Sequence, residues 1–171
     1  MTPIASIRPT PFPYFPEKKV QATSWTAKVA LLALLGGCAT AKLGDKAIEA
    51  ELKRFASKSE SASLYVCRED TFNGGGVGAE AFVNGKSIGS LKANTFAHVE
   101  VAHGEVSIFL RRTGLGLHAG DSGTLKLSAK AGDVIIVWAG PAGFMGPLTV
   151  DNFQSLAEGQ ACVRKASYAV S

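Results

Sequence analysis

From residue 62 onward, hydrophobic and polar residues alternate in short runs, the pattern of half-buried β-strands. Between two of these runs lies Asn84-Gly85, a dipeptide typical of a type I′ hairpin turn because both of its residues adopt positive φ. The predicted strands are SLYVCRE (63–69), the two halves of GAEAFVNGKSIGSL (78–91), TFAHVEV (95–101), EVSIFLRR (105–112), TLKLSAK (124–130) and DVIIVWAG (133–140). Strands separated by glycine-containing turns at roughly 8 to 12 residues predict an all-β domain over 62–171, an antiparallel β-sandwich of about seven strands. Residues 152–165 fit either a helix or a strand.

A helical period precedes the strands. Ile48, Leu52 and Phe55 recur at helical spacing after Asp45, a residue type that favours the N-cap position. We therefore expect a short amphipathic helix within a tether over 38–61, with its apolar stripe docked on the following domain. The alternative is a helix that binds a partner.

Nearer the N-terminus, the hydrophobic pattern is a continuous run. Val29–Leu35 is entirely apolar, Lys28 precedes it and two glycines follow it, which is the layout of a signal peptide. A membrane-spanning helix needs about 20 apolar residues, whereas the uncharged window here lies only between Lys28 and Lys42. The run is therefore interpreted as the core of a signal peptide within a leader over 1–37.

The four residues Leu35, Gly36, Gly37 and Cys38 resemble the bacterial lipobox. The resemblance implies cleavage before Cys38, a diacylglyceryl thioether on its sulfur and a third acyl chain on its new amino group. Stable anchoring requires more than one chain, because a single acyl chain binds membranes only marginally. The residue after the cysteine is Ala39 and not Asp. By the convention of bacterial lipoproteins, this implies sorting to the outer membrane. The alternative is a buried core helix with an incidental thiol.

The first 19 residues are rich in proline and do not favour folded structure. Two explanations stay open: the leader is unusually long, or translation starts near Val20 and residues 1–19 are not translated.

The charge distribution separates the leader from the rest of the chain. The formal net charge is +4, but four basic residues and one acidic residue lie before Cys38, which leaves the remainder close to neutral. The electrostatic footprint of a nucleic-acid-binding protein is therefore missing from the predicted domain.

No catalytic constellation emerges from the motifs. The glycines of FNGGGVGAE (72–80) lack the Lys-Ser/Thr of a phosphate loop and precede a strand. The histidines lack metal-ligand spacing, so we predict no metal site and no cofactor; they are His98, His103 and His118. Glu69 and Asp70 would point to opposite faces of a strand, which makes paired acid-base chemistry there unlikely.

The glycine-rich stretch AGPAGFMGP presents Phe144 and Met145 on a loop. Apolar residues on such a loop indicate a possible contact site. The alternative is that both side chains fold down as a lid on the end of the sandwich.

The order of the predicted strands carries a family resemblance. LYVCRE, VNGKSIGSL, NTFAHVEVAHGEVSI, LKLSAKAGDVIIVWAG and a closing ACVRKA are similar to small bacterial lipoprotein-borne domains of unknown function, in the style of PEGA-like β-sandwich modules. The similarity covers Ala62 to about Ala166. The chain departs from the family pattern at Cys67, where an aromatic residue is typical, and at His103-Gly104, where Pro-Gly is typical.

Family resemblance places Cys67 and Cys162 in the opening and closing elements of the domain. With Cys38 lipidated, these two form an even pair in an oxidising compartment, and we predict a disulfide between them. Two separate buried thiols are the alternative.

These observations predict a non-enzymatic lipoprotein of the bacterial cell envelope. The acylated Cys38 would bind the outer membrane, and the sandwich would face the periplasm and bind an envelope protein or a cell-wall glycan. The alternative is an envelope enzyme with its site in the loops near His118 and Asp121.

Overall fold

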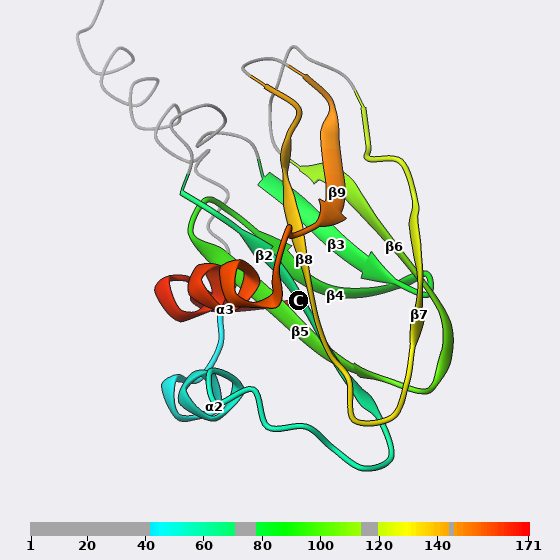
Figure 1. Cartoon of the computed structure of the whole chain (residues 1–171). Coiled ribbons are helices and arrows are strands. Elements are labelled where there is room, and N and C mark those ends of the chain that lie inside the picture. The colour runs from blue at the N-terminus through cyan, green and yellow to red at the C-terminus, as the bar shows by residue number, and fades with distance from the viewer. Residues whose placement is uncertain (1–41, 71–77, 114–119, 144–145) are drawn as a thin grey trace, which may run out of the picture. The chain divides into compact units, whose positions relative to one another are not determined.

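The computed structural model describes residues 42–70, 78–113, 120–143 and 146–171. All of them belong to one compact unit that spans Ala39–Ser171. Within the described residues the chain forms two β-sheets and two short helices (Figure 1). The unit is therefore mostly β.

One sheet has six strands in the order β1-β10-β5-β2-β8-β9 and the other has four in the order β4-β3-β6-β7. The larger sheet consists of β1 (Lys42–Leu43), β10 (Ser167–Val170), β5 (Thr95–Val101), β2 (Ala62–Arg68), β8 (Val134–Pro141) and β9 (Leu148–Asn152). The smaller sheet consists of β4 (Lys86–Leu91), β3 (Gly78–Val83), β6 (Gly104–Thr113) and β7 (Leu125–Ala129). The helices are α2 (Lys46–Leu52) and α3 (Leu156–Lys165).

All seven strands predicted from alternation are present, and so is the predicted hairpin. Asn84 and Gly85 connect β3 to β4 with φ values of 49° and 75°, as a turn with two positive-φ residues requires. Three further strands were not predicted, namely β1 with two residues, β9 with five and β10 with four. The two-sheet sandwich is confirmed, with more strands than expected.

The prediction of a purely antiparallel sandwich is wrong. Strand β2 pairs with β5 in antiparallel orientation but with β8 in parallel, and β10 pairs with β5 in parallel. The parallel neighbours arise because the chain leaves the larger sheet to form other elements before it returns beside β2 and β5. Every residue of β2 is buried, as expected for a central strand covered on both faces.

The two faces of the larger sheet are covered by different layers. Its inner face packs against the smaller sheet through aliphatic side chains, among them Leu64, Val66, Ile108, Leu110 and Val137. Its outer face carries Tyr65, Cys67, Phe96 and Ile136, and these pack against Phe55 and α3. Figure 1 shows α3 beside β2 and β8 on this outer side. The successive residues of β2 thus alternate between two cores.

The predicted helix over the tether is present as α2, and Asp45 is its N-cap. The Asp45 carboxylate accepts hydrogen bonds from the backbone N–H groups of Ala47 and Ile48, at 2.7 Å and 3.2 Å. The expected docking stripe is only partly correct, because Ile48 is exposed whereas Leu52 and Phe55 pack against the outer core.

Glu49 is the buried residue of α2 and joins the helix to β10. Its carboxylate accepts hydrogen bonds from Lys53 at 2.8 Å, from Lys46 at 3.0 Å and from the backbone N–H of Tyr168 at 3.1 Å. Burial opposes ionisation, but these hydrogen bonds outweigh it and lower the pKa of Glu49 to about 2. The segment expected to be a tether therefore contributes β1 and α2 to the folded unit.

The predicted disulfide is present between Cys67 of β2 and Cys162 of α3. Their Cα atoms are 6.4 Å apart, and 95 residues separate them in the sequence. Both cysteines are buried in the outer core. The bond therefore ties α3 to the central strand of the sheet that it covers.

Candidate functional site

A cleft of about 490 Å³ opens on the outer side of the larger sheet, at the start of α3. Strand β8 contributes Trp138, and Asp151 lies directly opposite it on β9. Glu158 approaches from the first turn of α3, and Glu69 from the residue after β2. We call this site the Trp138 cleft. It combines two aromatic side chains, those of Trp138 and Phe153, with carboxylates from three separate parts of the chain.

Gly140 gives the indole of Trp138 its position. The two residues lie on the same face of β8, and a Cβ on Gly140 would come within 2.5 Å to 3.2 Å of three atoms of the indole. The indole therefore lies along the backbone of Gly140, where any side chain would displace it. Trp138 stays partly exposed at the cleft, so it offers an aromatic surface to a ligand.

Two features hold α3 close to the sheet at this point. The hydroxyl of Ser155 caps the helix by accepting a hydrogen bond from the backbone N–H of Glu158, at 3.3 Å. Gly159 allows the close approach, because a Cβ there would lie 2.8 Å from the Cβ of Ile136 and 3.2 Å from the ring of Phe153. Phe153 itself lines the cleft. The position of Glu158 therefore depends on the packing of the next residue.

The polar groups of the Trp138 cleft are acidic or neutral. Asp151 accepts a hydrogen bond from the backbone N–H of Asn152 at 2.8 Å. Glu69 and Glu158 have no side-chain hydrogen bond or ion pair within the part of the chain that the structure describes. The side-chain amides of Asn152 and Gln154 complete the polar lining, and no described lysine or arginine contributes to it.

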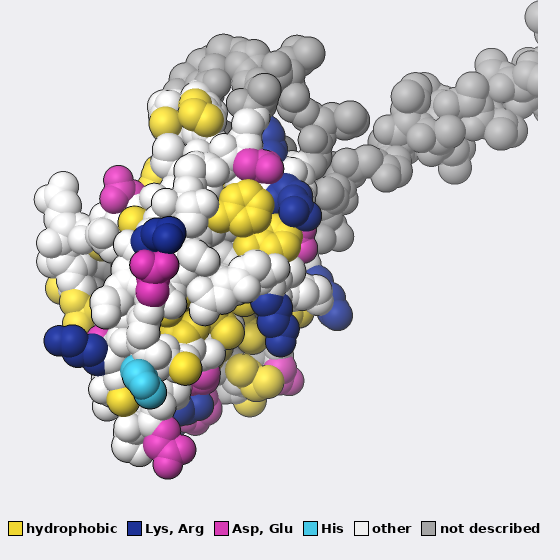
Figure 2. Space-filling view, turned by 90° about the vertical axis from the view of Figure 1, so that its right-hand side faces the viewer, with side chains coloured by type: hydrophobic (Ala, Val, Ile, Leu, Met, Phe, Trp, Pro, Cys, Tyr) yellow, Lys and Arg dark blue, Asp and Glu magenta, His cyan; other side chains and the backbone are white. Residues whose placement is uncertain are grey.

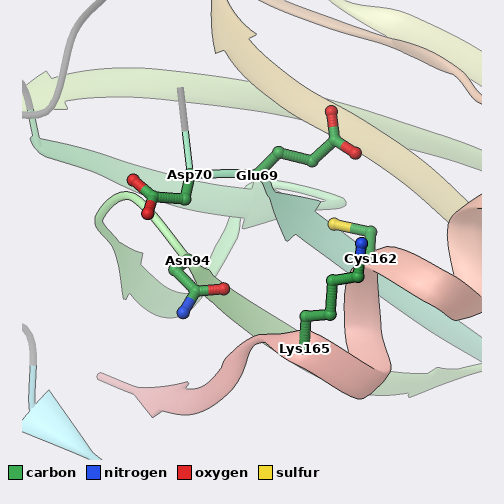
Figure 3. Close-up of a pocket in the computed structure, with 5 residues that line it drawn as sticks. All are labelled: Glu69, Asp70, Asn94, Cys162 and Lys165. Atoms are coloured by element: carbon green, nitrogen blue, oxygen red, sulfur yellow. The ribbon is translucent and has the colours of Figure 1, made fainter. Parts of the chain in front are cut away.

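A second pocket of about 300 Å³ lies on the other side of Glu69, between the end of β2 and the last turn of α3. Asp70, Asn94, Cys162 and Lys165 line it together with Glu69 (Figure 3). The carboxylates of Glu69 and Asp70 point away from each other, as expected for adjacent residues. The Cys67–Cys162 disulfide thus borders this second pocket.

A polar cluster on β5 brings titratable groups together elsewhere. The Nε2 atom of His98 lies 3.4 Å from one carboxylate oxygen of Glu100. The two oxygens of that carboxylate accept hydrogen bonds from the hydroxyls of Ser61 at 2.7 Å and Ser63 at 3.2 Å. Burial lowers the pKa of His98 below its usual value, which favours the neutral imidazole. The serines bond to the carboxylate and not to the imidazole, so this cluster fastens the segment before β2 onto β5.

A buried arginine marks the end of β2. Arg68 is the last residue of β2 and is 1 % exposed. Burial, together with the nearby positive charge of Arg112, lowers its pKa. Neither arginine was singled out from the sequence.

The outer face of the smaller sheet carries an aromatic pair. The rings of Phe82 and Phe109 are 5.1 Å apart, and the guanidinium of Arg111 lies 4.5 Å from the ring centre of Phe82. Figure 2 shows the side of the molecule formed by β6 and β7, where hydrophobic, acidic and basic side chains are interspersed. This face carries charges of both signs, Glu105 and Lys126 among them, and a hollow of about 450 Å³ lies on it between β6 and β7.

Several residues singled out from the sequence lie outside the described residues. These are the lipobox Leu35, Gly36, Gly37 and Cys38, the loop residues Phe144 and Met145, and His118. Asp121 is described, and its carboxylate accepts a hydrogen bond from the backbone N–H of Arg112 at 2.9 Å. Its observed contact is thus to the backbone of β6. No group of three or more His, Cys, Asp or Glu side chains suited to a metal occurs in the described part of the chain.

No protein-family model, curated protein or solved structure matches this chain. The described residues contain no helix that is both long enough and apolar enough to cross a membrane. The resemblance to lipoprotein-borne sandwich domains stays a prediction.

Sequence reasoning missed Trp138, Asp151 and Glu158 as site residues. One signal was present: Trp138 and Gly140 form a Trp-x-Gly pair on one face of a predicted strand, which leaves room for a flat indole. Another was Ser155 followed by Glu158, the spacing of a helix capping box. The antiparallel pairing of β8 with β9 places Asp151 beside Trp138, and the parallel pairing of β2 with β8 adds Glu69.

Proposed function

We propose that this chain is a lipoprotein of the bacterial outer membrane, anchored through acylated Cys38, with a non-enzymatic binding module facing the periplasm. Its ligand is a component of the cell envelope and occupies the Trp138 cleft. The observation that carries the binding role is the indole laid along Gly140 in a concave site with polar groups from β2, β9 and α3.

The anchor is supported by the sequence of the signal peptide and lipobox. Strand β1 begins at Lys42 and pairs with β10, so the folded unit would lie close to an acylated Cys38. The Cys67–Cys162 disulfide fits an oxidising compartment such as the periplasm and supports the location weakly.

The binding role is supported by the kind of site. Ligand sites are concave, contain apolar or aromatic surface and place a few polar groups for orientation. The Trp138 cleft has each of these properties. The aromatic pair at Phe82 and Phe109 lies on an open sheet face, where Arg111 already covers it.

Photocrosslinking in intact cells tests the binding role. A photoreactive residue in place of Gln154 lies in the cleft, and one in place of the exposed Lys86 on the smaller sheet serves as the control. We expect a specific crosslinked product from position 154 and none from position 86. Absence of a product at 154, or equal products at both positions, would rule out the cleft as the binding site.

The anchor is tested separately by Cys38→Ala. This change removes the only residue to which the lipobox chemistry applies, so the protein should leave the membrane fraction. Persistence of the altered protein in membranes after a high-salt wash would contradict lipid anchoring.

A further inference from the structure

We propose that the Trp138 cleft binds a neutral pyranose glycan, with one sugar ring stacked on the indole. This inference rests on the proposed function and names its ligand class. The argument uses the shape of the platform, the hydrogen-bonding groups around it and their charge.

The platform matches a sugar ring in form. A pyranose has faces made of C–H groups and an edge of hydroxyl groups, so it is apolar in one direction and polar in the other. The face of an indole is electron-rich and attracts such C–H groups, while its area excludes water from the sugar face. Gly140 holds the indole along the sheet, so the ring direction is set before a ligand arrives.

The groups around the platform match the hydroxyl edge. A sugar hydroxyl both donates and accepts hydrogen bonds, which calls for acceptors and for groups of mixed character. The carboxylates of Asp151 and Glu158 supply acceptors on two sides of Trp138. The amides of Asn152 and Gln154 each supply a donor and an acceptor. The lining thus offers hydrogen bonds to several hydroxyls of one ring.

Charge selects a neutral glycan over an acidic one. Glu69, Asp151 and Glu158 contribute three carboxylates, and the described lining contains no lysine or arginine. An anionic sugar or a phosphate would be repelled by these groups. The preferred units are therefore hexoses and N-acetylhexosamines, whether they belong to peptidoglycan or to another envelope polysaccharide.

The fluorescence of Trp138 provides a direct readout. The chain has two tryptophans, Trp25 in the predicted leader and Trp138 in the cleft. Trp25→Phe therefore leaves Trp138 as the only tryptophan whether or not the leader is cleaved. We expect a saturable change of its emission on titration with the tetramer of N-acetylglucosamine. Polygalacturonate, an acidic glycan of similar ring size, should produce no saturable change.

Calorimetry with the same tetramer tests the residues. Trp138→Ala should weaken binding about thirtyfold or more, as loss of an aromatic anchor does. Phe109→Ala removes a partly exposed aromatic from the other sheet and should leave the affinity unchanged. Trp138→Phe keeps a smaller ring and should retain part of the binding, which separates stacking from loss of fold.

Two sources of the glycan are distinguished by pull-down with purified peptidoglycan sacculi and with an uncharged envelope β-glucan. Retention on one of them, lost in Trp138→Ala and kept in Phe109→Ala, identifies the source. Release of reducing ends during incubation would instead reveal a hydrolase and overturn the binding-only account.

The glycan proposal fails if neutral oligosaccharides up to about 10 mM produce neither heat nor an emission change. If the photoreactive residue at position 154 then still captures a protein, the Trp138 cleft is a protein-binding site and only the glycan is wrong. If it captures nothing, the proposed function fails as well.

Discussion

The two faces of the six-stranded sheet differ in how they are held. The inner face packs through many aliphatic side chains against a second sheet, and their contacts are numerous and similar. The outer face has a smaller core that relies on particular ties, namely the Cys67–Cys162 disulfide, the contacts of Glu49 and the close approach at Gly159. The candidate site lies on the outer face.

The two faces differ in how strongly they depend on the identity of single residues. An alternating pattern is enough to build the inner face, because any aliphatic residue of suitable size contributes to it. The outer face places a helix, and hence Glu158, at a defined position over the sheet. That placement needs individual residues that do not tolerate replacement.

The largest expected effect comes from the disulfide. Replacing Cys67 and Cys162 by alanine should destabilise the unit by up to about 4 to 5 kcal/mol, the chain-entropy value for a closed loop of 95 residues. Urea unfolding of the oxidised protein and of the double variant measures it. Reduced wild-type protein keeps both thiols and is the matched control for lost packing. Equal midpoints in the oxidised and reduced proteins would contradict the role of the bond.

A smaller effect is expected at Gly159. Gly159→Val places a side chain where Ile136 and Phe153 already lie, which should cost about 1 to 3 kcal/mol through overpacking. Ala161→Val makes a β-branched change at an exposed position of the same helix and is the control. With Trp25→Phe in the background, Gly159→Val should also shift the emission of Trp138, whereas Ala161→Val should not. Equal effects of the two changes would mean that α3 does not need this close approach.

The smallest effect concerns Glu49. Its folded pKa of about 2 lies below the ordinary 4.5, so the stabilisation is fully present above pH 4.5 and is lost as the pH falls toward 2. Glu49→Gln should cost about 1 kcal/mol at neutral pH, in line with the net worth of hydrogen bonds. Thermal unfolding should show that the difference in stability between wild type and Glu49→Gln becomes smaller as the pH falls. A difference that stays constant from pH 7 to pH 3 would contradict stabilisation by the ionised carboxylate.

The sequence predicted the inner face well and the outer face poorly. Alternation locates the seven strands, and Asn84-Gly85 locates a turn, because these features depend on neighbouring residues only. Helix α3 contains Gly159, which lowers helix propensity, so the choice between helix and strand could not be made over 152–165. The glycine is present for packing against Ile136, a contact that sequence spacing does not reveal.

The site was less predictable than the fold for a related reason. Trp138 and Glu69 are distant in sequence and approach each other because β2 and β8 pair in parallel, with Cys67 opposite Trp138. An antiparallel sandwich, as predicted, gives no reason to pair these two strands. The disulfide could be predicted because two cysteines remain once Cys38 is assigned to the lipobox, and the family resemblance places them in the opening and closing elements of the domain.

The central claim is that the outer face depends on a few specific contacts, whereas the inner face is stabilised by its aliphatic packing alone. Hydrogen exchange of the oxidised and the reduced protein tests this claim most directly. Under conditions where the reduced protein stays folded, reduction should speed exchange at the backbone amides of α3, residues 156–165. Exchange in β6, residues 104–113, should stay unchanged. Equal acceleration of both elements, or no acceleration in α3, would contradict the account.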